Sequence, residues 1–213
     1  MPAREAARTP VSAATLVPRV SVPTATSDDD VPVVTSLAPD LATALRAAPF
    51  TYPALGSTAD PPAGYRRLAR TWTLPRADFE QAGERLMSWQ AHEGAGLRVA
   101  ASSPHAEAGA VVLMRLGPGP VALRIPCRVL YVVDEPDRTG FSYGTLPGHP
   151  VAGQELFRVD RDGRGGVTFT VEAVSTPATT LMRLGGPVAR WAQDRMMDRY
   201  RRALDRDRDV PGS

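Results

Sequence analysis

The residues with the clearest capacity for chemistry lie in one short stretch, in which His149 stands between Gly148 and Pro150 and Glu155 follows closely. An imidazole with an ordinary pKa near 6.5 can take up or release a proton at cellular pH, and a nearby carboxylate can orient the ring or act as a base itself. We therefore treat His149 and Glu155 as candidate catalytic acid and base groups. The alternative is a rigid turn whose imidazole caps backbone carbonyls, because turns rich in Gly and Pro need no catalytic reason.

Tyr143 and Thr145 share one face of the strand that is expected before this turn, and Phe141 lies on the same face. If that face is concave, the two hydroxyls would orient a small ligand inside an apolar pocket. Cross-strand packing explains the same alternation equally well. Trp72 and Trp89 are the candidate walls of such a pocket.

Two further side chains are candidates for ligand contact. His92 lies near Gly94, at the end of an expected helix, where a protonated imidazole is favoured and a capping role is the alternative. Arg183 belongs to a basic side of the last helix, which is otherwise a solvated face, and could turn inward to meet a ligand carboxylate.

Other chemistries find little support in the sequence. Cys127 is the only cysteine, so there is no intrachain disulfide and no cysteine zinc cluster, and it fits a small buried apolar residue. His92, His105 and His149 lack metal-ligand spacing. No Gly-x-Ser-x-Gly elbow, Walker loop or dinucleotide-binding glycine motif is present. We predict no metal site and no cofactor.

Composition indicates a soluble globular protein. The chain has 213 residues, of which 43% are apolar and 23% charged, and no apolar run approaches the roughly 20 residues that cross a bilayer. All 25 basic residues are arginine, which is typical of a GC-rich genome. They are interleaved with acids and the net charge is only +2, so we expect no nucleic-acid partner. A cytoplasmic location is expected, and the oligomeric state stays open.

Three segments are expected along the chain. Residues 1–48 form a leader rich in Pro and Ala, disordered or loosely structured, with a short helix over 37–48. Residues 49–206 form the folded domain, and 207–213 a disordered tail.

Within the domain, period-2 alternation over Tyr65–Leu74 predicts a strand, and a helix follows from Pro75 or Asp78 to the glycines at 94–96. Six more strands are expected before a long C-terminal helix, which starts near Pro177 and is interrupted at Gly185-Gly186-Pro187. The six strands cover Leu97–Ala101, Ala110–Leu116, Val121–Val133, Gly140–Leu146, Gln154–Asp160 and Gly166–Val174, with Pro126 marking a bulge or an edge.

This order predicts an α+β helix-grip fold. A curved antiparallel sheet of about six or seven strands would wrap around the long C-terminal helix, with one further helix after the first strand. Because a strongly curved sheet cannot pack flat on one helix, space for a ligand should remain between them.

Several motifs also resemble a family of uncharacterised bacterial and plant proteins, DUF1990 or UPF0548, over roughly Phe50 to Leu204. That family looks related to the START, Bet v 1 and polyketide-cyclase superfamily, which implies the same helix-grip fold but no settled chemistry. The resemblance rests on Gly64-Tyr65, the stretch from Trp89 to Gly96, Pro126 to Val129, Phe141 to Pro150, Gly153, Glu155 and Arg183 to Arg190.

The sequence is compatible with three functional hypotheses. The leading hypothesis is a soluble protein that binds a small hydrophobic molecule, polyketide-like or lipid-like, between the sheet and the last helix. The second is a cofactor-independent cyclase, dehydratase or hydrolase of secondary metabolism that acts on a polyketide-like substrate through His149 and Glu155, by analogy of fold. The third is an interaction module tethered by the leader.

Overall fold

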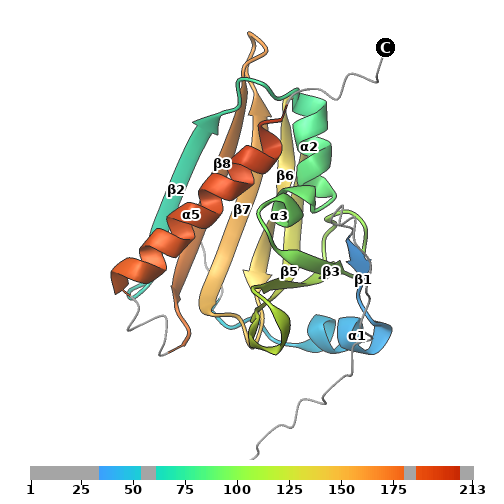
Figure 1. The fold of residues 1–213 in the computed structure, drawn as a ribbon, viewed down its shortest axis with the longest axis vertical. Coiled ribbons are helices and arrows are strands. Elements are labelled where there is room, and N and C mark those ends of the chain that lie inside the picture. Colours follow the sequence, from blue (N-terminus) through green and yellow to red (C-terminus); the bar gives the residue numbers. More distant parts are fainter. Residues whose placement is uncertain (1–33, 54–60, 180–185, 207–213) are drawn as a thin grey trace, which may run out of the picture. The chain divides into compact units, whose positions relative to one another are not determined.

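The computed structural model describes residues 34–53, 61–179 and 186–206, with side chains from residue 192 onward in the last range. All of them belong to one unit, Val31–Ser213. Its eight strands form one sheet in the order β1-β3-β4-β5-β6-β7-β8-β2, in which every pair is antiparallel except β1 with β3 (Figure 1). The strands are β1 Thr35–Ser36, β2 Arg66–Thr73, β3 Arg98–Ala101, β4 Val111–Leu116, β5 Leu123–Glu135, β6 Arg138–Thr145, β7 Val151–Arg161 and β8 Val167–Pro177.

Helix α5, Gly186–Leu204, runs across one face of this sheet, beside α2 and α3 (Figure 1). The α+β helix-grip arrangement expected from the sequence is therefore confirmed. The sheet gains one strand over the expected number because β1, only two residues long, has no readable alternation. The other helices in the described ranges are α1 Pro39–Ala47, α2 Phe79–Met87, α3 Gln90–Gly94 and the short 3₁₀ turn η1 Gly119–Val121.

Helix α2 begins where the sequence indicates. The Asp78 side chain accepts a hydrogen bond from the Gln81 amide at 3.2 Å, and Phe79 and Leu86 are buried. The single helix expected up to Gly94 is instead split, because Trp89 adopts a left-handed conformation with φ 68°. Its ring is fully buried and its indole N–H donates to the Ser103 carbonyl, so packing holds the backbone in this conformation.

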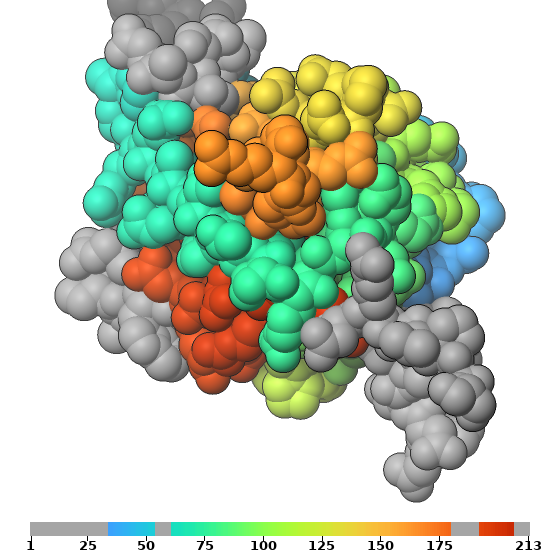
Figure 2. All heavy atoms as spheres, turned by 90° about the horizontal axis from the view of Figure 1, so that it is seen from above, coloured from blue at the N-terminus to red at the C-terminus, as the bar shows by residue number. Residues whose placement is uncertain are grey.

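The main core lies between the sheet and helices α2, α3 and α5. Alternate residues of the strands point into it, as period-2 patterning requires. The C-terminal end of α5 is fixed at the edge of this layer, where the Arg76 amide and guanidinium donate to Asp205 at 3.0 and 2.9 Å. Figure 2 shows this end of α5 (red) beside the segment that links β2 to α2 (turquoise).

A second apolar cluster covers the opposite face of the sheet. Leu41 and Leu45 of α1, and Leu37 two residues before that helix, pack on Val111 and Leu113 of β4. Residues 34–48, assigned to the leader from the sequence, thus add a strand and the expected helix to the folded unit. Residues 1–33 and 207–213, which complete the predicted leader and tail, lie outside the described residues.

Pro126 lies inside β5, which has a neighbour on both sides. Its carbonyl accepts from the Leu146 amide at 3.0 Å, so its nitrogen also faces the β6 side, where β6 has already ended at Thr145. The N–H that proline lacks therefore leaves no strand–strand hydrogen bond unmade, because β6 no longer runs beside β5 at this position. The irregularity of β5 lies further along, between Val129 and Tyr131.

The expected start of the last helix was wrong. Ser175, Thr176 and Pro177 continue β8 and do not cap a helix. Helix α5 begins at Gly186, with Pro187 in its first turn, where proline is tolerated. None of the helices in the described ranges is long and apolar enough to cross a membrane.

Candidate functional site

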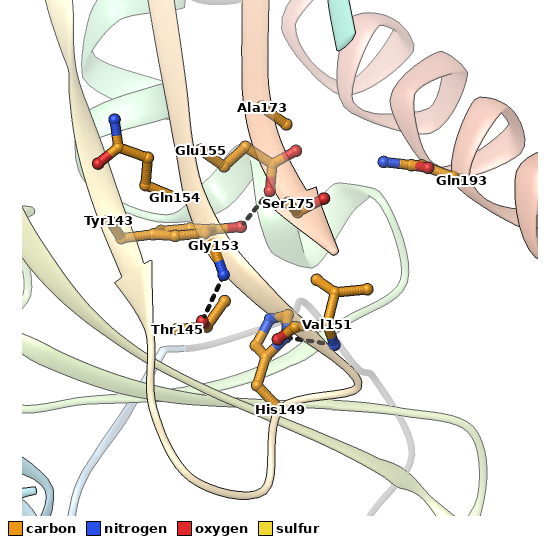
Figure 3. A pocket seen from close by; sticks show the side chains of 10 residues that line it. All are labelled: Tyr143, Thr145, His149, Val151, Gly153, Gln154, Glu155, Ala173, Ser175 and Gln193. Atoms are coloured by element: carbon orange, nitrogen blue, oxygen red, sulfur yellow. Dashed lines mark hydrogen bonds between the residues drawn. The ribbon is translucent and has the colours of Figure 1, made fainter. Parts of the chain in front are cut away.

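A small pocket lies between the sheet and α5, at the end of β6 and β7 (Figure 3). Its volume is about 30 Å³, which is the space of one or two water-sized groups. Side chains from β6, β7, β8, α5 and the turn after β6 surround it. They are Tyr143, Thr145, His149, Val151, Gly153, Gln154, Glu155, Ala173, Ser175 and Gln193.

The sheet register brings the polar groups together. Tyr143 of β6 stands opposite Glu155 of β7, and Glu155 stands opposite Ala173 of β8, so all three share one face. The turn from β6 to β7 is closed by a hydrogen bond from the His149 amide to the Leu146 carbonyl at 3.1 Å.

Tyr143 and Glu155 form a direct polar pair. The Tyr143 hydroxyl donates to the Glu155 carboxylate oxygen Oε2 at 3.0 Å (Figure 3). Burial raises the pKa of Glu155 to about 7, although the hydrogen bond from Tyr143 acts in the opposite direction. Burial also raises the pKa of Tyr143 well above its usual value, and the charge of Glu155 adds to that rise. The pair therefore holds a carboxyl that changes charge near neutral pH beside a phenol that keeps its proton.

Thr145 has a positioning role in the wall of the pocket. Its Oγ1 accepts a hydrogen bond from the Gly153 amide at 2.9 Å and shares a second one with the Thr51 hydroxyl at 2.6 Å. The Thr51 amide also donates to the Thr145 carbonyl. The hydroxyl of Thr145 thus ties the start of β7 to the segment that precedes residue 54, and its bonding capacity is largely used by the protein itself.

His149 is held by the backbone at one nitrogen. Its Nδ1 lies 2.8 Å from the Val151 carbonyl and 3.1 Å from the Val151 amide, and the ring lies against the pocket (Figure 3). Burial lowers the pKa of His149 to about 4, against the opposite effect of the hydrogen bond to Val151. The imidazole is consequently neutral at cellular pH. His149 thus bonds the turn backbone, as the rigid-turn alternative predicted, and it also lines the pocket, whereas its catalytic role stays a prediction.

His92 lies deeper, in the aromatic core. It is fully buried, and neither ring nitrogen has a hydrogen-bond partner among the described residues. Burial lowers its pKa to about 3, so the protonated capping role considered from the sequence does not apply. Its ring packs on five aromatic side chains at centroid distances of 5.0 to 6.2 Å, namely Trp89, Phe141, Tyr143, Phe157 and Tyr200.

Phe141, Trp89 and Trp72, three other expected ligand contacts, do not line the pocket. Phe141 and Trp89 are fully buried in the aromatic core, where their ring centroids are 5.1 Å apart. Trp72 stacks on Phe169 near the far end of the sheet. Arg183 lies outside the described residues. Rings therefore fill the interior around His92, where the sequence had suggested open space, and the pocket lies at the polar end.

Six of the ten pocket residues were not predicted as site residues, namely Val151, Gly153, Gln154, Ala173, Ser175 and Gln193. Ser175 continues the alternation of Val171 and Ala173 along β8, but only the pairing of β7 with β8 places it beside this site. Gln193 faces the pocket from α5 (Figure 3). A signal for it existed, since it extends a buried stripe at helical spacing, made up of Met197, Tyr200 and Leu204.

The assembled groups can accept and donate single protons. The carboxyl of Glu155 and the neutral imidazole of His149 border the same small space, with the hydroxyl of Tyr143 as a fixed donor. A metal is not favoured, because no three of the His, Cys, Asp and Glu residues in the described ranges are grouped to hold one.

Comparison with curated proteins finds relatives in a bacterium and a plant. A UPF0548 protein of Deinococcus radiodurans is 49% identical over 79 residues, which are 37% of this chain and 40% of that protein. A UPF0548 protein of Arabidopsis thaliana is 36% identical over 75 residues, which are 32% of this chain and 37% of that protein. The matched part thus spans about two fifths of the length of these relatives.

Among solved structures, hypothetical protein jhp0584 from Helicobacter pylori is similar with a TM-score of 0.51 at 7% identity, over 65% of this chain and 85% of that one. At that identity the likeness concerns the fold alone. Ginseng major latex-like protein 151 from Panax ginseng has a TM-score of 0.48 at 12% identity, over 67% of this chain and 97% of that one.

The expected family resemblance is confirmed by a family model. The model described as "Domain of unknown function (DUF1990)" matches residues 51–203, which include β2 to β8, α5 except its last residue, and every described residue of the pocket. The chain therefore belongs to the DUF1990 family.

Proposed function

We propose that the protein binds a small, largely apolar molecule between the sheet and α5, with a polar end of the ligand in the pocket at Glu155. The observation that carries the proposal is the concentration of polar groups at one end of an otherwise apolar interior. Binding sites of this kind combine apolar walls with a few convergent polar groups that fix the orientation of the ligand.

The apolar body of the ligand would lie on the same face of the sheet, toward β2. In the sheet, Glu155 lies opposite Ala173, and Ala173 lies opposite Leu68, which is only partly buried. Trp72 lies further along the same face of β2 and is also partly buried. These side chains supply apolar surface that a ligand can cover.

A ligand screen tests this proposal. Native mass spectrometry and thermal shifts against hydrophobic metabolites should find a compound, and NMR should place it by shifts of the Gly153 and Ala173 amides. Ala173→Leu adds three carbons at the pocket wall and should weaken binding at least about tenfold. Thr176→Leu, on the other face of β8, is the matched control and should bind normally. A screen without binders, or binders indifferent to Ala173→Leu, would overturn the proposal.

Acid–base catalysis is the second candidate function. The observation in its favour is the pKa of about 7 for Glu155, since a catalytic acid or base works best with a pKa near the operating pH. A cofactor-independent cyclase, dehydratase or hydrolase would use Glu155 as the proton carrier and the neutral His149 as its partner. With a turned-over substrate in hand, Glu155→Gln and His149→Ala should each lower kcat by about 100-fold or more. Full turnover in both variants would remove this candidate.

A further inference from the structure

The pocket offers acceptors to a ligand and few free donors. Tyr143 uses its only hydroxyl proton on Glu155, and Thr145 already bonds Gly153 and Thr51. The carboxylate of Glu155 accepts through two oxygens, and the phenolic oxygen of Tyr143 keeps a lone pair. Gln154, Ser175 and Gln193 can take either role. A ligand group that donates hydrogen bonds therefore fits this wall better than one that accepts them.

Among the described residues, no cation is paired with the carboxylate of Glu155. Burial and the hydrogen bond from Tyr143 are the two causes that set its pKa, and no arginine lines the pocket among the described residues. An ionised carboxylate removed from water is costly unless an opposite charge accompanies it.

In the described part of the chain, the titratable groups near Glu155 whose pKa is shifted are neutral near pH 7. Arg66 of β2, opposite Ser175, carries a charge but is exposed and does not line the pocket. Burial and the charge of Glu155 raise the pKa of Tyr143 on β6, Tyr200 on α5 and Cys127 on β5. Burial lowers the pKa of His149 in the turn and of His92 on α3. From β8, the pocket is faced by the uncharged Ala173 and Ser175.

From this arrangement we infer that the pocket recognises the protonated amine of an otherwise apolar ligand, with the Glu155 carboxylate as its counter-ion and the Tyr143 phenolic oxygen as a further acceptor. This inference rests on the proposed binding function and names the polar end of the ligand. A primary ammonium group is one heavy atom with three N–H donors, and it fits a volume of about 30 Å³. Entry of the cation ionises Glu155, so binding below the pKa of that carboxyl releases a proton to the solvent.

Three matched probes test the inference, namely butylammonium, 1-butanol and butyrate, titrated into the whole protein at about pH 8, where Glu155 is ionised. Shifts of the Gly153, Ala173 and Ser175 amides report occupancy of the pocket. Butylammonium should bind at least about tenfold more tightly than 1-butanol, and butyrate most weakly. Butyrate binding as tightly as butylammonium would overturn the inference.

Glu155→Gln should lower the affinity for butylammonium about tenfold or more and leave that for 1-butanol within about twofold. Glu172→Gln is the matched control, because Glu172 lies on the opposite face of β8 and pairs with Arg67 at 3.0 Å. It should leave all three probes unaffected. An equal loss in both variants would also contradict the inference.

Calorimetry supplies a second measurement. At about pH 6, butylammonium binding to the unaltered protein should release protons, seen as a dependence of the heat on the ionisation enthalpy of the buffer, and Glu155→Gln should abolish it. If 1-butanol or screened compounds occupy the pocket without any preference for the ammonium, this inference fails while the binding function stands. If no probe and no screened compound shifts the pocket amides, both fail.

Discussion

Two of the titratable groups beneath α5, the fully buried His92 and the partly buried Glu155, lie in opposite surroundings. At the aromatic end, His92 is enclosed by rings without a hydrogen-bond partner in the described part of the chain. At the polar end, Glu155 is bonded by Tyr143 beside a small pocket. Burial favours the neutral form of both, which takes the pKa of His92 down to about 3 and that of Glu155 up to about 7. Burial thus keeps His92 neutral at cellular pH, whereas it brings the pKa of Glu155 to a value at which the carboxyl gains and loses its proton.

The largest effect is expected for the loss of unfolding free energy at acid pH that His92 causes. His92 stays neutral in the folded protein down to about pH 3, whereas the unfolded chain takes up a proton near its ordinary pKa of 6.5. The contribution of neutral His92 to the unfolding free energy is therefore complete above pH 6.5 and is lost as the pH falls toward 3. The unaltered protein should lose roughly 4–5 kcal/mol more than His92→Leu over that window in urea unfolding. Parallel stability curves for the two proteins would contradict the assignment.

Removal of one ring tests how much the aromatic end contributes to the stability of the protein. Phe157 is fully buried and packs on His92, Tyr143 and Tyr200. Phe157→Ala should cost about 3–5 kcal/mol of unfolding free energy, because it leaves a cavity at the centre of the cluster. A loss below about 1 kcal/mol would mean that the cluster collapses around the gap.

Glu155 predicts the opposite pH dependence. The unfolded carboxyl ionises near 4.5 and the folded one near 7, so its burial destabilises the fold increasingly as the pH rises through that window. Glu155→Gln should be about 2–3 kcal/mol more stable than the unaltered protein at about pH 8 and nearly equal to it at about pH 4. Urea unfolding at the two pH values measures this, with Glu172→Gln as the control that should show no such difference.

Tyr143→Phe tests the hydrogen bond inside the polar pair. The bond lowers the pKa of Glu155, so its loss should raise that pKa further, which carboxyl NMR during a pH titration can follow. The unfolding free energy should fall by about 1–2 kcal/mol at neutral pH, since the buried carboxylate loses its donor. A pKa that falls or stays constant would show that another donor replaces the phenol.

The smallest effect is expected at the rim. Ser175 is only partly buried, and Ser175→Ala should change the unfolding free energy by less than about 0.5 kcal/mol. Its effect should appear in ligand affinity instead, measured with the probes described above. A large loss of stability would mean that the pocket rim, like the ring cluster, is a structural element.

Local patterns in the sequence were sufficient for most of the fold. Alternation and turn residues predicted β2 to β8, and the stretch from Tyr143 to Glu155 was correctly singled out as the place where polar groups gather. What the sequence did not reveal depends on tertiary packing. The left-handed backbone of Trp89 is held by its buried ring, and the filling of the space around His92 depends on rings from α3, β6, β7 and α5.

The placement of α1 has a practical consequence for anyone who prepares the protein. The family match begins at residue 51, but Leu37, Leu41 and Leu45 shield Val111 and Leu113 on the outer side of the sheet. A chain trimmed to the match would present bare aliphatic side chains to water, which invites self-association. Similarity and burial thus disagree about where the domain starts, and expression trials should follow burial by retaining the residues from 34 onward.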